Sequence, residues 1–366
     1  MKDLIVKNIK PFITALGIVG FVLACMYHTS CHITPEGIHL ITNETESTKI
    51  CSYTVENNNI DVEFTNNVEV EECFAIEVHE AETKFTSIDQ FMSSVKRIPV
   101  EWFEDPDDYV IHYKLNEKTE IGKKYQMYSV VRERNGSSLS FAVPFNGEND
   151  HFPELVISEI NEAYSKKENI PEYIELYAIS SGNLFGLELI TASDDRHFEL
   201  PCIEVKKGEY IVVHLRKDPD DKTAITESGS DLTLSKSKGS TPARDIWMDN
   251  QQNVLNSSAE IVILNNKAKK KMMDCLMYCK KEYAEVNKNW KSEKLIEYSR
   301  LCSEAGLWSQ NPNPESAVYS NQRKSISYIS RTNINKFNGS DKIQNNAQCW
   351  TGTPKSKMTP GRANNW

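Results

Sequence analysis

Short runs of alternating apolar and polar residues recur along most of the chain, and they predict an all-β protein. The densest series lies between residues 155 and 215, where Gly, Pro, Asn, Ser or charged residues separate each run from the next. That spacing is typical of strands joined by short turns. The strands predicted in this stretch are Leu155–Ile160, Glu172–Ile179, Leu184–Thr191 and Ile203–Leu215.

An earlier series of β-prone runs predicts a separate domain over residues 34–148. Asn135-Gly136 stands between two of these runs and signals a tight hairpin. Ser87–Val95 is the one segment with helical spacing, and Ser87 suits its N-cap. The strand spacing favours an antiparallel sandwich. The predicted strands are Ile38–Ile41, Lys49–Val55, Ile60–Phe64, Cys73–Val78, Tyr109–Leu115, Lys124–Val131 and Ser138–Val143.

The second predicted domain covers residues 153–366 and is less regular. Residues 218–243 are polar and too poor in apolar residues to fold alone, which predicts a mobile loop. Strands are predicted again at Ala259–Leu264 and Lys271–Tyr278. Residues 280–307 then place apolar residues among Lys and Glu at helical spacing, so we expect a helical insertion in this β domain.

The N-terminal segment predicts export. Lys2, Lys7 and Lys10 precede an apolar run over residues 11–24. That run has the length of a signal-peptide core and is short for a membrane span. The alternatives to an exported, anchored protein are a conventionally cleaved signal peptide and an uncleaved anchor helix.

Residues 22–25 read Val-Leu-Ala-Cys and resemble a bacterial lipobox. The resemblance implies a signal peptide over residues 1–24, a lipid-bearing Cys25 and a tether over residues 25–33. Several acyl chains on Cys25 would hold the protein on a membrane, because a single chain binds only marginally. We therefore expect a lipid-anchored protein of the bacterial cell envelope, at the outer membrane, in the periplasm or on the cell surface.

Export makes disulfides possible among the other cysteines. Eight cysteines allow 105 connectivities, so spacing alone assigns none. The two pairings considered are Cys51 with Cys73, in nearby predicted strands, and Cys279 with Cys302, which flank the helical insertion. Zinc is disfavoured because the chain has no Cys-x-x-Cys and no His near Cys275 or Cys279.

A series of motifs in the second domain resembles a lamin-tail domain, an Ig-like β-sandwich. Ala178 departs from that pattern, which usually has Asn there, and the polar loop and helical insertion are additional to it. Residues 125–149 also resemble the last hairpin of bacterial Ig-like domains, so the resemblances together imply two Ig-like β-sandwich domains in tandem. The lamin-tail motifs are Val156–Asn161, Glu172–Tyr177, Leu184–Leu189, Ile203–Val213, Ile261–Asn265, Asp274–Tyr278, Ser330-Arg331, Trp350 and Thr359–Asn364.

The net charge of −10 disfavours a general nucleic-acid binder. A local basic region in and before the helical insertion is the candidate partner surface, and it could contact anionic lipid, polysaccharide or nucleic acid. The alternative is a solvated helix face. The candidate residues are Lys269, Lys270, Lys271, Lys280, Lys281, Tyr283 and Trp290.

Two glutamates, Glu159 and Glu175, could act as a pair of acid–base carboxylates. The lamin-tail pattern has acids at both places in proteins without such activity, so a structural role is favoured. The acidic turns 105–108 and 218–221 lack the spacing of an EF-hand loop. No His stands in a His-Glu-x-x-His motif, and Gly-x-Ser-x-Gly and phosphate-binding Gly loops are absent from the sequence. We predict no catalytic residue, metal or cofactor.

The sequence thus predicts a membrane-anchored lipoprotein that acts as a non-catalytic binding, adhesion or scaffold module. Its partners would be a membrane, through the N-terminal lipid, and a protein or polysaccharide. Bacterial lamin-tail domains often accompany exported nucleases and phosphatases. The alternative is therefore an accessory subunit of such a hydrolase, or a cryptic hydrolase.

Overall fold

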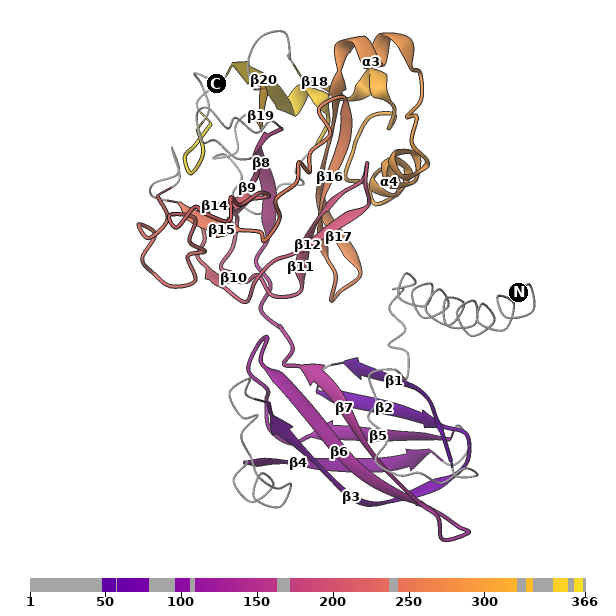
Figure 1. Cartoon of the computed structure of the whole chain (residues 1–366). Helices are drawn as coiled ribbons and strands as arrows, with labels where there is room; N and C mark the ends of the chain where they lie inside the picture. The colour runs from indigo at the N-terminus through magenta and orange to yellow at the C-terminus, as the bar shows by residue number, and fades with distance from the viewer. Residues whose placement is uncertain are drawn as a thin grey trace, which may run out of the picture. The chain divides into compact units, whose positions relative to one another are not determined.

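The computed structural model describes residues 48–56, 58–78, 96–105, 109–162, 172–236, 243–320, 327–331, 345–354 and 359–364. Its sheets are arranged as in β-sandwiches, with few helices, so the protein is all-β (Figure 1). The chain divides into two compact units, one up to Glu148 and one from Asn149. Among the described residues, none of the helices is both long enough and apolar enough to span a bilayer.

Several expectations fall outside the described residues. They are the signal peptide 1–24, Cys25, the tether 25–33, the strand Ile38–Ile41 and the helix Ser87–Val95.

The first unit is an antiparallel sheet of seven strands in the order β1-β2-β5-β4-β3-β6-β7. Six of the strands expected from the sequence are confirmed, and β4 is an addition to them. The strands are β1 (Ile50–Glu56), β2 (Asn59–Phe64), β3 (Val68–Glu77), β4 (Arg97–Asp105), β5 (Val110–Leu115), β6 (Lys124–Glu133) and β7 (Ser138–Asn146).

Alternation explains the core of the first unit. In β6, Tyr125, Met127, Ser129 and Val131 are buried while the residues between them are partly exposed, as a strand with one face on a core requires. Strand β4 pairs with β3 through Arg97–Pro99 and with β5 from Val100 onward. It therefore joins the two halves of the sheet, which curl over one core.

The second unit contains two larger sheets and a short two-stranded pair, β10 (Gly182–Asn183) with β13 (Glu204–Val205). The six-stranded sheet is β15 (Arg244–Trp247), β14 (Tyr210–His214), β9 (Tyr173–Ala178), β8 (Leu155–Asn161), β19 (Ser327–Arg331) and β20 (Trp350–Pro354). The five-stranded sheet is β12 (Arg196–Glu199), β11 (Leu187–Thr191), β16 (Ala259–Asn266), β17 (Lys271–Lys280) and β18 (Val318–Ser320).

One apolar cluster fills the space between the two larger sheets. Ile157, Leu176 and Ile211 reach it from the six-stranded sheet, and Val262 and Leu276 reach it from the five-stranded sheet. All five are fully or almost fully buried. This is the layered arrangement of a β-sandwich.

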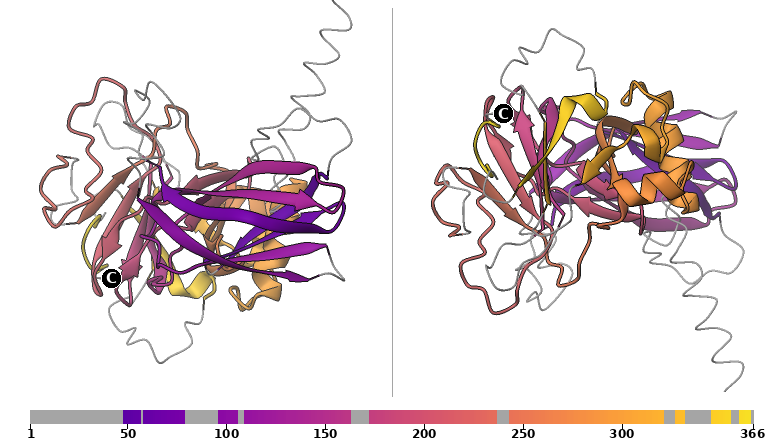
Figure 2. Two further views of the ribbon diagram at one scale, coloured as in Figure 1. Left: turned by 90° about the horizontal axis from the view of Figure 1, so that it is seen from below. Right: turned by 90° about the horizontal axis from the view of Figure 1, so that it is seen from above.

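Two helices lie within residues 280–307, the range for which the sequence predicts a helical insertion. They are α3 (Lys281–Val286) and α4 (Glu293–Glu304), which lie together beside β16 and β17 (Figures 1 and 2). Helix α4 buries Leu295, Ser299 and Cys302. The segment 218–236 lies on the opposite side of the unit from the helices (Figure 2).

Neither of the two considered disulfides is present in this structure, where all four of their cysteines are free thiols. Cys51 lies in β1 and Cys73 in β3, which are not neighbours in the sheet. The thiol of Cys73 donates a hydrogen bond to the carbonyl of Val100 at 3.4 Å instead.

Candidate functional site

The outer face of the six-stranded sheet carries a pair of carboxylates, Glu159 on β8 and Glu175 on β9. The two residues face each other across the strands, and neither is exposed to solvent. An irregularity in β8 between Ile157 and Glu159 explains this placement. Regular alternation would put Ile157 and Glu159 on the same face, but the bulge lets Ile157 enter the core while Glu159 faces outward.

Residues Thr359–Asn364, which we call the closing segment, cover these carboxylates. The hydroxyl of Thr359 donates to Glu159 at 3.1 Å, and the backbone N–H of Gly361 donates to Glu175 at 2.5 Å. The side-chain amide of Asn364 donates to the backbone carbonyls of Ser158 and Arg331, at 3.0 and 3.1 Å.

Hydroxyl groups of the sheet itself complete this arrangement. Tyr173 donates a hydrogen bond to Glu159, and Ser158 donates one to Glu175. Burial, with the Glu159 carboxyl as a second cause, raises the pKa of Glu175 well above its usual range. A carboxyl with a raised pKa is suited to general-acid chemistry. Because both groups are covered, the arrangement in this structure binds the closing segment rather than a substrate.

A buried histidine–aspartate pair lies on the same outer face and was not anticipated from the sequence. Nε2 of His214 in β14 is 2.9 Å from the Oδ1 atom of Asp245 in β15. The His214 ring stacks on Trp247, with 3.9 Å between ring centroids, and meets the edge of Tyr173. The two strands run parallel and a long loop separates them, so no local motif signals the pair.

The segment 218–236 covers this pair and is held by polar contacts. Glu227 is fully buried, and its carboxylate accepts hydrogen bonds from the N–H groups of Asp245 and Ser235, at 2.9 and 3.0 Å. Arg244 reaches the carbonyl of Gly229 at 2.9 Å and the carboxylate of Glu209 at 2.5 Å. The sequence predicts a mobile loop here because the segment has few apolar residues. In the structure, its described part makes hydrogen bonds through the buried side chains of Glu227 and Arg244.

A second buried ion pair joins the two sheets. Asp274 of β17 accepts two hydrogen bonds from the guanidinium of Arg331 in β19, at 2.8 and 3.0 Å, and one from the N–H of Ile157 at 2.8 Å. The Asn345 amide also donates to Asp274, and the guanidinium lies over the Trp350 ring, 4.6 Å from its centroid. Such bidentate pairing offsets the cost of burying the charges.

The residues of the candidate partner surface are not brought together. Lys269, Lys270 and Lys271 lie at the turn between β16 and β17, whereas Lys280 and Lys281 lie at the other end of that hairpin beside α3 (Figure 1). The nine-residue offset along β17 separates the two groups by about 30 Å.

The two aromatic residues of that surface pack rather than protrude. Trp290 is buried, and its indole N–H donates to the carbonyl of Pro312 at 2.9 Å. The Tyr283 hydroxyl accepts from the N–H of Lys291 at 3.0 Å, and its ring centroid lies 6.4 Å from that of Trp290. Helical spacing predicted the helices correctly but could not say which face turns inward.

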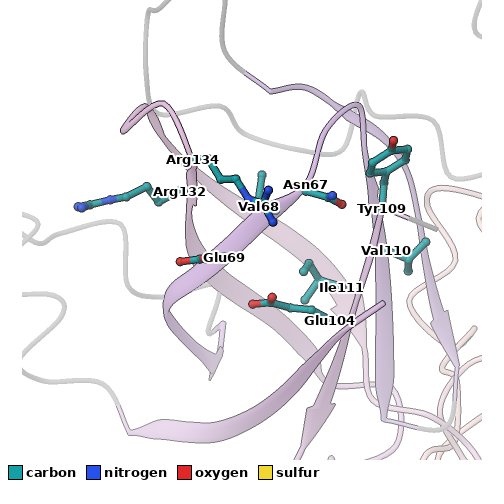
Figure 3. Close-up of a pocket in the computed structure, with 9 residues that line it drawn as sticks. All are labelled: Asn67, Val68, Glu69, Glu104, Tyr109, Val110, Ile111, Arg132 and Arg134. Atoms are coloured by element: carbon teal, nitrogen blue, oxygen red, sulfur yellow. The ribbon is translucent and has the colours of Figure 1, made fainter. Parts of the chain in front are cut away.

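The first unit has a small opening where β3 and β4 diverge (Figure 3). Its volume is about 70 Å³, and Glu69, Glu104, Tyr109 and Arg134 contribute to its walls. Arg132 points away from the other labelled residues (Figure 3) and pairs with Glu71 at 2.6 Å. An opening of this size holds about two water molecules, which is too little for a substrate.

The described residues contain no group of three or more His, Cys, Asp and Glu that could hold a metal ion. In the acidic turn 218–221, Asp218 accepts from the N–H of Asp220 and Asp221 accepts from Thr223, at 3.1 and 2.8 Å. These contacts are those of Asx turns. Three residues of the other acidic turn, 106–108, lie outside the described ranges.

The comparisons with known proteins concern the second unit. A family model with the description TP_1001 protein second domain matches residues 153–352. An uncharacterized protein of Treponema pallidum (strain Nichols) is 26% identical over 201 residues, which make up 52% of this chain and 49% of that protein. The chain thus spans about half the length of this relative. No solved structure matches.

The matched range contains every lamin-tail-like motif from β8 to Trp350, and it includes the Glu159–Glu175 and Asp274–Arg331 pairs. It covers more than half of the 366 residues. The chain belongs to the TP_1001 protein second-domain family.

Proposed function

We propose that this protein is an exported lipoprotein, anchored to a membrane of the bacterial cell envelope through Cys25, and that it acts as a non-catalytic binding, adhesion or scaffold module. The lipobox-like residues 22–25 support the anchor. The polar motif residues Glu159, Glu175, Asp274 and Arg331 hold segments of the second unit together, and this structural role supports a non-catalytic function.

The observation that carries the proposal is the cover over Glu159 and Glu175. These are the best acid–base candidates in the sequence, and both accept hydrogen bonds from the closing segment. Asp274 and Arg331 likewise join one sheet to the other. Residues that hold distant segments of a sandwich together support a scaffold whose binding groups lie elsewhere.

We further infer that the second unit is lamin-tail-like and the first Ig-like. The motifs that carry the lamin-tail resemblance meet in space: Glu159, Glu175 and the Thr-Pro-Gly turn on one face, and Asp274, Arg331 and Trp350 between the sheets. The curled antiparallel sheet of the first unit is compatible with an Ig-like sandwich, in which loops at the ends of the strands carry recognition.

Exposed aromatic residues around the β4–β5 hairpin are the best candidate for ligand recognition. Phe103 is 62% exposed, Tyr109 48% and Trp102 42%. The Phe103 ring stacks on His112, with 4.3 Å between centroids. Exposed large rings of this kind are enriched where proteins bind partners, because they bury much apolar area with little loss of entropy.

Two measurements test the proposal. Mass spectrometry of the mature N-terminus should find acyl chains on Cys25; an unmodified Cys25, or cleavage elsewhere, would contradict the anchor. The protein without its N-terminal segment should then be screened against matrix proteins, peptidoglycan, lipid vesicles and DNA.

We expect a bound protein or polysaccharide whose affinity falls at least tenfold in a Phe103→Ser/Trp102→Ser variant. A matched variant, Val286→Ser, removes an even more exposed apolar residue of α3 and should leave that affinity unchanged. Equal losses in both variants would contradict recognition by the first unit.

The exported hydrolase remains the second candidate, and the His214–Asp245 pair is the observation that favours it. A histidine held by a carboxylate is a common general base. Phosphodiesterase or phosphatase activity that disappears in a His214→Gln variant would replace the binding proposal with this one. Retained folding of that variant, checked by circular dichroism, makes the comparison fair.

A further inference from the structure

Two buried cysteines meet where the helical insertion packs on the five-stranded sheet. Cys275 lies on the face of β17 that turns toward α4, and Cys302 lies on the buried side of α4. Both are fully buried. They are 27 residues apart in sequence, and most of the insertion, including α3, lies between them.

Leu307 links the two residues. The Cys275 thiol donates to the carbonyl of Leu307 at 3.5 Å, and the N–H of Leu307 donates to the carbonyl of Cys302 at 2.9 Å. A side-chain hydrogen bond with Cys302 is also the largest of the causes that raise the pKa of Cys275. The shared contacts with Leu307 place Cys302 beside Cys275 where α4 packs on β17, and both residues are free thiols in this structure.

Cys279, the partner suggested by the sequence, is in a different place. It lies on the same face of β17 but four residues further along, about 13 Å from Cys275. Its thiol is directed to the carbonyl of Pro314 at 3.5 Å. A thiol on α4 that touches Cys275 cannot also reach Cys279.

We propose that Cys275 and Cys302 form a disulfide in the mature protein. The inference rests on the export part of the proposed function, because an exported chain meets an oxidising compartment. The two thiols lose two protons and two electrons, and one S–S bond replaces two S–H bonds. The oxidant is an exported thiol–disulfide oxidoreductase, whose own disulfide is reduced to two thiols by exchange through a mixed disulfide.

The bond forms before the insertion has packed. In the folded dithiol, the hydrogen bond with Cys302 and burial raise the pKa of Cys275 well above its ordinary value. Because the thiolate is the nucleophile in disulfide exchange, the packed pair reacts slowly. A chain that is still unfolded after export exposes both thiols.

The disulfide would fasten the helical insertion to the sandwich. Helix α4 otherwise meets the β11–β12 turn through polar contacts of Asp195, with the Tyr298 hydroxyl at 2.6 Å and the Lys294 ammonium at 3.0 Å. Those contacts weaken at high salt. A covalent link to β17 does not, so the helices would keep their position in any ionic environment.

The decisive experiment maps the protein as it is exported. The full chain is expressed in a bacterium that processes lipoproteins, its membranes are treated with N-ethylmaleimide before lysis, and the protein is digested without reduction. We expect a peptide pair joined through Cys275 and Cys302, about 2 Da lighter than the two thiol peptides. Alkylation of both residues, or a link from either to Cys279, overturns the inference.

The same digest separates this inference from the proposed function. An acylated Cys25 with alkylated Cys275 and Cys302 leaves the lipoprotein proposal standing and removes the disulfide. A joined peptide pair with an unmodified Cys25 removes the lipid anchor and keeps the disulfide.

Variants provide a second readout. Reduction with dithiothreitol should lower the Tm of the wild-type protein by roughly 4–16 °C. In a Cys302→Ala variant reduction should not change the Tm, and in the matched control Cys279→Ala the wild-type shift should persist. A wild-type Tm that is insensitive to reduction, or a shift that is lost in Cys279→Ala, contradicts the proposed pairing.

Discussion

The two units bury different kinds of side chain. Among the described residues, the first unit buries no charged side chain, and its buried polar residues are Thr48, Thr119 and Ser129. The second unit buries many charged groups, including Glu175, Glu227, Asp245, Asp274 and Arg331. Both units nevertheless fold as layered β-sheets around an apolar core.

The contrast teaches what holds each unit together. In the first unit, strand neighbours along the sheet and alternation of apolar residues account for the packing. In the second, buried ionisable side chains link segments far apart in the chain, such as β17 with β19 and β9 with the closing segment. A buried charge is costly without its partner, so the second unit should respond more strongly to polar substitutions and to pH.

The largest effect is expected from Arg331→Met. This change leaves Asp274 buried without its guanidinium, and we expect the free energy of unfolding of the second unit to fall by about 3–5 kcal/mol. Urea unfolding followed by tryptophan fluorescence reports mainly on this unit, because Trp247, Trp290, Trp308 and Trp350 lie in it and only Trp102 lies in the first unit.

Adding Asp274→Leu to Arg331→Met should recover part of that loss, since no uncompensated charge is then left behind. A double variant less stable than the sum of the two single ones would contradict the assignment of the cost to an unpaired charge.

The next largest effect is expected from pH, which should change the stability of the second unit. Burial raises the pKa of both Glu172 and Glu260 from the ordinary value of 4.5 to about 7. Their folded forms therefore hold a proton that the unfolded chain has released. The stability that this provides is complete below pH 4.5 and is lost as the pH rises through 7, by on the order of 3 kcal/mol per carboxyl.

In the first unit, we expect a pH dependence of stability with the opposite sign. Hydrogen bonds from Thr48 lower the pKa of Glu133, so its contribution is present above pH 4.5 and is lost on acidification. Urea unfolding of the second unit at pH 5 and pH 7.5 tests the prediction. Equal stability at the two values, or a higher stability at pH 7.5, would show that these glutamates are not held protonated.

A moderate effect is expected from Asn364→Ala. The change leaves the carbonyls of Ser158 and Arg331 without the amide that donates to them, which should cost about 1–3 kcal/mol. Hydrogen exchange of the β8 peptides should increase. Arg362→Ala is the matched control, because its side chain is exposed in the same segment. In this control variant, hydrogen exchange of the β8 peptides should stay as in the wild type.

The smallest effect is expected in the first unit, from Arg97→Met. The guanidinium is 3.3 Å from Glu72 and lies over the Phe74 ring, but the side chains of the ion pair are 48% and 57% exposed. Exposed pairs contribute about 0–1 kcal/mol. A loss approaching that of Arg331→Met, measured by thermal unfolding, would erase the distinction between the two units.

Alternation made most strands of the first unit predictable. Strand β4 was missed because Pro99 and three acidic residues interrupt its apolar pattern. In the second unit, Ile203–Leu215 was expected as one strand but is divided into β13 and β14 around Gly208, whose φ of +83° requires a turn. The short strands β12, β15, β18, β19 and β20 have too few residues to show a period.

The pairs of polar residues also differ in whether the sequence could predict them. The pairing of Glu159 with Glu175 could be predicted from the sequence, because the lamin-tail pattern that the chain resembles has acids at both positions and adjacent strands carry them. His214 and Asp245 meet through parallel strands, and Cys275 meets Cys302 through a helix that packs on a sheet. Such contacts depend on tertiary placement, which spacing along the chain does not contain.

The link between Asn364 and Ser158 spans 206 residues, and that distance has a kinetic consequence. Strand β8 obtains its neighbour β19 and its cover only after the intervening chain is available. Contacts of such high sequence separation form slowly because loop closure must come first. If the chain is exported as we propose, it would thus stay extended during its passage through a translocon, which would suit transport through a narrow pore and prolong its exposure to proteases and folding catalysts on the far side.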